Sequence, residues 1–565
     1  MKKKYVFLLV CMFLFVAFGG EVNAKKNGAA GTGCEGLASA FSYPSTTLTS
    51  VTPQAAGPVT VSGIAYNMPD HCVVQGYMNK RTGSDGQPYQ IGFEMRLPTN
   101  WNGRFFYQAN GGIDGAVVPA YGTGLGGGPT SQALQKGFAV ISSDAGHQSP
   151  APFFGIDPQA RIDYGYNAVA QLTPMAKSLI NSYYGKLPDK SYFVGCSNGG
   201  RHAMVAASRY ADQYDGILAG NPGFNLPQAA VSQLWGAQQY STISTPATNL
   251  FSSFTPAEFS LVGDKILAKC DALDGLVDDM VTNPLACQSV FDLDADVPTC
   301  LGGRDGTCLT AAQKVVLADI IAGAKNSAGK PLYTNFLWDV GIKGSNWSFW
   351  EFFASTFLDP GAVAFIFGTP PENPAGFNGL AYALNLGGAG FDPDVDAPKI
   401  FDTFGPYTES GMSFMTPPDL TMSGLFAHKS KLLVFHGTAD AVFSVADTIK
   451  WYEDFRDTWG GRAQTAARLF LVPQMNHCNS GPSCDQFDML DALVKWVEQG
   501  PPPNSIVAKA RGAGANSVNA EVPGTWAPDR TRLLCPYPKV AKYLGRGSIE
   551  DAASFQCLPE TVPLD

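Results

Sequence analysis

The sequence predicts an α/β fold in which helices cover a mixed, mostly parallel sheet and a large insertion interrupts the chain. Two observations support this prediction: apolar runs alternate with helix-like segments, and this βα rhythm stops in the middle of the chain and later resumes. The apolar runs before the interruption are residues 92–97, 104–108, 138–142 and 191–195. Those after it are residues 431–435 and 469–472, and helical spacing is clearest over residues 166–184 and 487–498.

The interruption divides the chain that follows residue 24 into three parts. Residues 25–223 form the first part of the predicted core, and residues 419–565 form the second. Residues 224–418, here called the insertion, are rich in Gly, Pro, Phe and Trp and contain few clear strands. We expect the insertion to form a lid domain on the core.

The first 24 residues are typical of a cleavable signal peptide. Residues 2–4 are lysines, residues 5–18 are apolar, and residues 22–24 (VNA) end the segment. A membrane anchor is the alternative, but fourteen apolar residues are short for a membrane span and no later run approaches eighteen. The segment therefore predicts a secreted or periplasmic protein.

The net charge excludes two classes of binding partner. Removing the predicted signal peptide takes away three lysines and one glutamate, so the formal net charge moves from −10 to −12. We do not expect a chain this acidic to bind nucleic acid or an anionic membrane, and we expect a monomer.

The twelve cysteines become eleven without Cys11. Exported proteins hold most cysteines in disulfides, and because eleven is an odd number, one thiol must stay unpaired or pair between chains.

The most informative motif is residues 195–199 (GCSNG), which lie between an apolar run and an Ala-rich helical segment. In a G-x-S-x-G elbow the serine occupies a strained turn between strand and helix, and its hydroxyl stands at the helix N-terminus. This context predicts that Ser197 is a nucleophile. The pattern alone is weak evidence in a chain with 62 glycines.

Two further polar residues follow the late apolar runs. Asp440 ends residues 436–440 (HGTAD), and His477 follows residues 473–476 (PQMN). Nucleophile, acid and base thus occur in the chain order of α/β-hydrolases, in which acid and base project toward the serine from loops at the C-terminal edge of the sheet. The alternatives are a solvated turn residue for Asp440 and a buried loop histidine for His477. Order and placement together favour a catalytic triad.

Cysteines stand next to two of these three residues. Cys196 directly precedes Ser197, and Cys478 directly follows His477. A disulfide between them would place their Cα atoms within about 4.4 to 6.8 Å and hold nucleophile and base close together. Pairing of each cysteine with a different partner is the alternative.

Residues 195–201 (GCSNGGR), 436–440 (HGTAD) and 476–478 (NHC) resemble the tannase and feruloyl esterase family. The resemblance extends from about Cys34 to Cys557. Residues 101–106 (WNGRFF) and 157–161 (DPQAR) are most similar to the branch that contains mono(2-hydroxyethyl) terephthalate hydrolase. The resemblance implies an α/β-hydrolase core with a large lid, a serine-esterase triad, and a disulfide from Cys196 to Cys478.

The resemblance also implies the other disulfides. They are Cys34 with Cys72, Cys270 with Cys287, Cys300 with Cys308, and Cys535 with Cys557. Cys484 is then unpaired. It lies only a few residues beyond Cys478, so an exchange of partners between those two is the alternative.

Residues 271–280 (DALDGLVDDM) place several carboxylates around one glycine, which suits a hard cation such as Ca²⁺. The spacing does not fit an EF-hand, and a solvated acidic loop is the alternative. The resemblance implies that Asp271, Asp274 and Asp278 supply carboxylates and that Leu276 and Met280 supply backbone carbonyls. We expect the calcium to be structural, and we expect no organic cofactor.

The tetrahedral intermediate of an acyl transfer needs two preorganised hydrogen-bond donors. The backbone N–H of Asn198, directly after the nucleophile, is the usual first donor. The second should come from the loop after the strand that ends at Gln108. Gly112 matches the family's position there, and the alternative for it is an ordinary turn glycine.

Substrate choice should come from the insertion, where eight aromatic residues crowd into residues 347–367. Most of them are expected to be core of the lid. Trp350 and Phe443 match positions that pack on the substrate ring in the terephthalate branch, which favours an aromatic acyl group.

The insertion departs from that branch in its charges. The branch recognises a free carboxylate through an arginine of the lid, whereas this chain has none between Arg304 and Arg456. Lysines at 325, 330 and 343 would offer only a point charge. We therefore predict a carboxylic-ester hydrolase for uncharged feruloyl or benzoyl esters. The alternatives are a mono(2-hydroxyethyl) terephthalate hydrolase, a tannase for gallate esters, and, from other classes, a serine peptidase or a non-catalytic calcium-binding protein.

Overall fold

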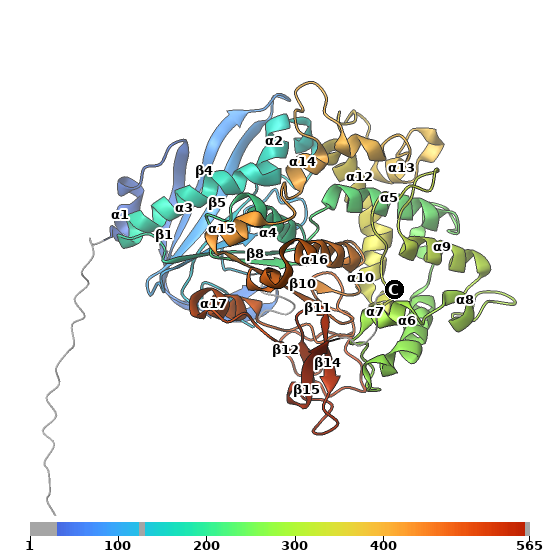
Figure 1. The fold of residues 1–565 in the computed structure, drawn as a ribbon. Coiled ribbons are helices and arrows are strands. Elements are labelled where there is room, and N and C mark those ends of the chain that lie inside the picture. Colours follow the sequence, from blue (N-terminus) through green and yellow to red (C-terminus); the bar gives the residue numbers. More distant parts are fainter. Residues whose placement is uncertain (1–30, 124–129, 560–565) are drawn as a thin grey trace, which may run out of the picture.

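A computed structural model describes residues 31–123 and 130–559 of the chain (Figure 1). The predicted signal peptide, residues 1–24, lies outside the described residues. Within the described residues, no helix has the length and apolar character needed to cross a membrane.

The centre of the structure is a nine-stranded sheet with the order β1-β4-β5-β7-β6-β8-β9-β10-β11. The six strands from β7 to β11 in this order run parallel, and the three strands at the other end are antiparallel. The strands are β1 (Thr46–Gln54), β4 (His71–Thr82), β5 (Pro88–Pro98), β6 (Arg104–Ala109), β7 (Ala139–Ser143), β8 (Lys190–Cys196), β9 (Gly216–Gly220), β10 (Lys431–Gly437) and β11 (Ala467–Val472). The predicted mixed, mostly parallel sheet is confirmed.

Helices cover both faces of the sheet, and the residues of each strand alternate between the two faces. In β8, Phe193 packs in one core cluster, whereas its neighbours Tyr192 and Val194 pack in another. The first cluster contains side chains of α3 (Ala168–Tyr184), α4 (Asn198–Arg209) and α16 (Val445–Trp459), and the second contains α17 (Met489–Gln499). The near-continuous apolar runs of the sequence follow from burial of the strands on both faces.

Every strand of the large sheet lies either before residue 221 or after residue 430. The insertion is mainly helical, and Figure 1 shows its helices gathered on one side of the sheet. Its elements include α5 (Leu226–Ser241), α6 (Pro256–Cys270), α7 (Pro284–Gln288), α9 (Ala311–Ala322), η5 (Val340–Lys343), α10 (Ser345–Ser348), η6 (Phe349–Ala354), α11 (Ser355–Phe357), η7 (Ala362–Phe367), α13 (Gly379–Ala383), η9 (Ala397–Phe401) and α14 (Gly411–Met415).

A buried arginine of the first core segment binds the insertion. Arg161 donates hydrogen bonds to the carbonyl oxygens of Phe365 and Gly368 and to the hydroxyl of Thr369. Its guanidinium also lies over the ring of Tyr407, 4.4 Å from the ring centroid. A planar group with five donors can satisfy several carbonyls at once, so one side chain fixes this part of the insertion on the core.

Small two-stranded sheets complete the fold. They pair β2 (Gly57–Val61) with β3 (Ile64–Met68), β12 (Ile506–Lys509) with β13 (Thr531–Leu534), and β14 (Lys539–Tyr543) with β15 (Phe555–Pro559).

The described residues form five disulfides, which are the five pairs that the family resemblance implies: Cys34–Cys72, Cys196–Cys478, Cys270–Cys287, Cys300–Cys308 and Cys535–Cys557. Cys484 is free and buried. Burial raises the pKa of its thiol to about 12, so the group stays protonated and unreactive at neutral pH.

The close approach of α4 to the sheet depends on a glycine. A Cβ atom added to Gly200 would lie 2.2 Å from the carbonyl oxygen of Gly220 at the end of β9. We expect Gly200→Ala to lower the free energy of unfolding by about 1 to 3 kcal/mol, because the helix must move away from the strand. Urea unfolding followed by tryptophan fluorescence measures the change.

Gly461→Ala is the matched control, because a Cβ atom at that position meets no atom within 4 Å. Equal stability of the two variants would contradict the inferred contact between α4 and β9.

Candidate active site

Ser197 lies at the junction between β8 and α4, at the C-terminal edge of the parallel strands. Its φ is 66°, in the left-handed region, and its N–H donates to the carbonyl oxygen of Gly220 at 3.0 Å. A Cβ atom on Gly195 would lie 2.6 Å from the carbonyl group of Gly199. The two glycines of the motif therefore permit the sharp turn that places the hydroxyl at the start of α4.

Three side chains from separate loops form one hydrogen-bonded line. The Nε2 of His477 lies 2.7 Å from the hydroxyl oxygen of Ser197, and its Nδ1 lies 2.8 Å from the Oδ2 of Asp440. Asp440 follows β10 and His477 follows β11. The structure thus brings the three predicted residues together at the same edge of the sheet.

Asp440 is a buried carboxylate surrounded by donors. It accepts the backbone N–H groups of Val442 and Phe443, each at 3.0 Å, and the side-chain amide of Asn221 at 2.7 Å. Burial alone would raise the pKa of Asp440, but His477 beside it, with further hydrogen bonds, lowers that pKa well below its ordinary value. The carboxylate is therefore ionised throughout the neutral range.

Sequence reasoning missed two neighbours of this acid. Asn221 directly follows β9 and has a φ of 36°. The Nε2 of His436 lies 3.3 Å from the Oδ2 of Asp440, and its Nδ1 lies 2.9 Å from the hydroxyl of Thr448. His436 stands inside the HGTAD motif, which was its only signal in the sequence, and Asn221 had none.

The loop after β6 passes directly beside the serine. A Cβ atom on Gly111 would lie 3.7 Å from the Cβ and 4.0 Å from the hydroxyl oxygen of Ser197. The next residue, Gly112, has a φ of 64°, and its carbonyl oxygen accepts from the hydroxyl of Tyr164 at 3.4 Å. Gly112 and Asn198, the two predicted oxyanion donors, therefore lie on backbone segments directly beside Ser197.

A buried polar network joins these two segments. The side-chain amide of Asn198 donates to Asp114 at 2.9 Å, and the Nε2 of His202 lies 3.0 Å from the same carboxylate oxygen. Arg201 donates to the amide oxygen of Asn198 at 2.7 Å. Burial raises the pKa of Asp114 well above its ordinary value. No sequence pattern had indicated that Asp114 links the loop of Gly112 to the start of α4.

The two predicted substrate-binding aromatics flank the imidazole. The rings of Trp350 and Phe443 lie edge-to-face with His477, at centroid distances of 5.0 and 5.3 Å. The insertion also holds the histidine loop, because Asn346 accepts the backbone N–H of His477 at 3.3 Å. Apolar rings therefore lie directly beside the imidazole of His477, the middle member of the hydrogen-bonded line.

The comparisons with known proteins agree with this geometry. A sequence model of the family described as "Tannase and feruloyl esterase" matches residues 72–558, which is most of the chain. The chain belongs to the tannase and feruloyl esterase family. Mono(2-hydroxyethyl) terephthalate hydrolase of Piscinibacter sakaiensis is 39% identical over 542 residues, which are 89% of this chain and 87% of that protein.

Two solved structures have the same fold as this member of the tannase and feruloyl esterase family. They are an esterase and feruloyl esterase B, both from Aspergillus oryzae, with TM-scores of 0.74 and 0.72 and identities of 21% and 24%. Each comparison covers 93% of this chain and 99% of the other chain. The fold is that of the α/β-hydrolases, as predicted, and the protein is a carboxylic ester hydrolase.

The lysines of the insertion that were weighed as carboxylate binders are largely engaged elsewhere. Lys325 lies 2.8 Å from Asp319, and Lys343 lies 3.0 Å from Asp264. Each of these charges is paired with an acid of the insertion itself, so neither is free to hold a substrate carboxylate without breaking that pair.

The predicted calcium segment carries its acids close together, but they make internal contacts. Asp271 accepts the backbone N–H groups of Asp278, Asp279 and Met280. Asp278 forms ion pairs with Arg530 and Arg532. Across residues 31–123 and 130–559, no group of three or more His, Cys, Asp or Glu side chains is arranged so that it could hold a metal ion.

The chemistry of the segment nevertheless suits a hard cation. Burial raises the pKa of Asp274 to about 6 and also raises that of Asp271, and the nearby Asp278 adds to both shifts. The Oδ1 of Asp278 is buried without a hydrogen-bond partner. A cation would offset these unfavourable charges. Calcium binding by these acids and by the carbonyls of Leu276 and Met280 stays a prediction.

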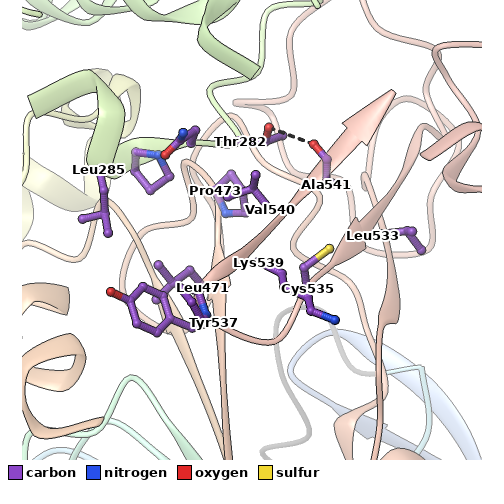
Figure 2. Close-up of a pocket in the computed structure, with 13 residues that line it drawn as sticks. Thr282, Leu285, Leu471, Pro473, Leu533, Cys535, Tyr537, Lys539, Val540 and Ala541 are labelled. Atoms are coloured by element: carbon purple, nitrogen blue, oxygen red, sulfur yellow. Dashed lines mark hydrogen bonds between the residues drawn. The ribbon is translucent and has the colours of Figure 1, made fainter. Parts of the chain in front are cut away.

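The segment also contacts the C-terminal strands. Thr282 donates to Asp274 and to the carbonyl oxygen of Ala541 in β14. Figure 2 shows the second of these hydrogen bonds at the edge of a small pocket between residues 282–285 and the strands near the Cys535–Cys557 disulfide. The acidic segment therefore connects the insertion to the last part of the core.

Two acids of the insertion, Glu351 and Asp359, are buried. Burial raises the pKa of Glu351 to about 8 and that of Asp359 to about 8, and each residue is at most 5% exposed. In an unfolded chain such groups release their protons near pH 4. Between that pH and about 8 the folded protein holds protons that the unfolded chain has lost, so the stability falls as the pH rises.

We therefore expect Glu351→Gln to reduce the pH dependence of stability. The wild-type free energy of unfolding should fall by up to about 1.4 kcal/mol per pH unit for each such acid as the pH rises from 5 toward 8. The glutamine variant should show a shallower fall, because it has no proton to lose. Urea unfolding at pH 5.5 and pH 8 measures both slopes.

Asp457→Asn is the control for this comparison, since Asp457 is an exposed acid on α16. Identical slopes for wild type and Glu351→Gln would show that Glu351 is already ionised in the folded protein.

Proposed function

We propose that the protein is a secreted serine esterase that hydrolyses uncharged aromatic esters of the feruloyl or benzoyl type through an acyl-enzyme. The observation that carries the proposal is the hydrogen-bonded line from Ser197 through His477 to Asp440. In this arrangement the imidazole can take the serine proton while the buried carboxylate fixes its tautomer and stabilises the imidazolium.

The proposed reaction has two halves. In the first, the hydroxyl oxygen of Ser197 attacks the ester carbonyl, its proton passes to the Nε2 of His477, and the imidazolium then protonates the departing alkoxide. In the second, His477 takes a proton from water, hydroxide attacks the acyl-enzyme, and the carboxylic acid leaves as Ser197 regains its proton. The N–H groups of Asn198 and Gly112 donate to the oxyanion in both halves.

The proposed substrate class follows from the surroundings of His477. Trp350 and Phe443 supply aromatic surface on which an aryl group can pack. A terephthalate monoester carries a free carboxylate. The insertion has no arginine after Arg304 that could bind this carboxylate through a bidentate pair of hydrogen bonds. Neutral aryl esters are therefore the first candidates, with mono(2-hydroxyethyl) terephthalate and gallate esters as the alternatives.

Export and calcium are part of the same proposal. Five disulfides are typical of a protein that matures in an oxidising compartment. We expect a bound Ca²⁺ to neutralise the acids of residues 271–278 and to secure the insertion, with no part in the chemical step.

The first test is steady-state hydrolysis of methyl ferulate, ethyl benzoate, methyl gallate and mono(2-hydroxyethyl) terephthalate. We expect turnover of the neutral aryl esters and a loss of at least about 1,000-fold in kcat for Ser197→Ala and for His477→Ala. The double variant should be no slower than either single variant, because the two residues act as one unit.

Ser39→Ala, at an exposed serine of α1 (Gly33–Ala40), is the control. Preference for the terephthalate monoester would overturn the argument from the missing arginine and leave the triad intact. Hydrolysis of a peptide anilide without any ester would favour a peptidase, and no turnover of any substrate would favour a non-catalytic protein.

The second test concerns calcium. We expect added Ca²⁺ to stabilise the chelator-treated protein against thermal unfolding, by about 2.7 kcal/mol at a hundredfold excess over Kd. Asp274→Asn should abolish most of this stabilisation, whereas Asp279→Asn, at an adjacent acid outside the predicted ligand set, should retain it. An equal response of both variants would exclude the predicted site.

A further inference from the structure

Three phenylalanines form an exposed row on the insertion. Phe349, Phe353 and Phe357 recur every four residues along the continuous helical segment of η6 and α11. They are 45%, 43% and 72% exposed. Contacts between neighbouring rings place the three side chains on one face of the segment.

The rings of this row contact one another in sequence. Phe349 and Phe353 lie 5.5 Å apart between ring centroids, and Phe353 and Phe357 lie 5.1 Å apart and are stacked with an interplanar angle of 20°. These distances lie within the favourable range for aromatic pairs. The row is therefore an ordered aromatic surface.

The row is continuous with the active site. Phe349 packs edge-to-face on Trp350 at 5.3 Å, and Trp350 packs edge-to-face on His477 at 5.0 Å. A path of aromatic contacts thus leads from the proposed general base to the surface of the insertion.

The segment is held in place by its other face. Phe352 is buried and packs against Tyr240 and Phe259 at 4.9 and 5.9 Å. The hydroxyl of Ser355 donates to the carbonyl oxygen of Glu351 at 2.6 Å. The exposed rings of Phe353 and Phe357 are therefore not needed to fix the helix.

We propose that Phe349, Phe353 and Phe357 form a substrate subsite that binds a second aromatic ring, beyond the ring that lies next to the scissile ester. This inference rests on the proposed function, because it requires an aromatic ester in the site at His477. The row itself contains no charged or polar side chain, so it favours an uncharged ring. Among aromatic esters, the row therefore favours those with two or more linked rings over those with a single ring.

The test compares esters that share a benzoyl ester but differ in ring number. Ethyl benzoate has one ring. 2-Phenoxyethyl benzoate adds a ring on the alcohol side, and ethyl 4-benzyloxybenzoate adds one on the acyl side. We expect the double variant Phe353→Ala/Phe357→Ala to lose about 3- to 10-fold in kcat/KM, through KM, on at least one two-ring ester. Its kcat/KM on ethyl benzoate should stay within about 2-fold of wild type.

Two further variants separate stacking from other effects. Phe353→Leu/Phe357→Leu keeps apolar side chains but removes the rings, so it should show most of the same loss. Phe401→Ala, at another exposed phenylalanine of the insertion, is the matched control and should leave all three substrates unchanged.

The other outcomes overturn the inference in distinguishable ways. Equal losses on one-ring and two-ring esters would assign the row a purely structural role. Unchanged kcat/KM on both two-ring esters would exclude the subsite, and a concentration-dependent dimer that the alanine variant abolishes would assign the row to contact between two copies. If the two-ring esters fail this test while wild type still hydrolyses ethyl benzoate, only the inference is overturned. If wild type hydrolyses no ester, the proposed function fails as well.

Discussion

The site depends on one covalent constraint between two distant parts of the chain. The Cys196–Cys478 disulfide joins residues 282 positions apart, with their Cα atoms 6.1 Å from each other. It connects the residue before Ser197 to the residue after His477, and both Ser197 and Cys478 have positive φ, at 66° and 64°. Two strained loops are thus held against each other, which keeps the imidazole within hydrogen-bond distance of the hydroxyl. Preorganisation of this kind removes much of the entropic cost of bringing the proposed nucleophile and the proposed base together.

Electrostatics imposes the second requirement, because the acid of the line is a buried charge. An ionised carboxylate in the interior is costly unless donors surround it. Asp440 is surrounded by its own turn, by the imidazoles of His477 and His436, and by Asn221 beyond β9. Although β9 supplies no member of the proposed triad, it still matters for Asp440, because the residue directly after it, Asn221, donates to that carboxylate.

The sequence predicted the parts whose signals are local and missed those that depend on neighbours. Apolar runs identified β5, β6, β7, β8, β10 and β11, and motif order identified the three polar residues that meet. The strand β9 was missed because glycines occupy both of its ends. They are needed there, since a Cβ on Gly216 or Gly220 would meet the rings of Tyr192 or Phe435 at 2.7 or 2.2 Å. Asp114 and Asn221 were missed for another reason, which is that their roles come from partners far away in the chain. The acids of residues 271–278 form an obvious pattern in the sequence. Their sequence neighbours gave no sign that Asp278 pairs with Arg530 and Arg532, which lie just before and within β13.

One short segment of the insertion, residues 341–357, has two roles. Its residues fix the loop that carries His477, because Asn476 donates to the carbonyl oxygen of Gly341 and Asn346 accepts the N–H of His477. The same segment presents Trp350 to the imidazole. We therefore expect a change on its buried face, at Glu351 or Phe352, to alter the position of His477 as well as that of Trp350. A change on its exposed face, at Phe353 or Phe357, alters only what the surface can bind. Variation in substrate length is thus possible at the exposed face without disturbing the chemical step.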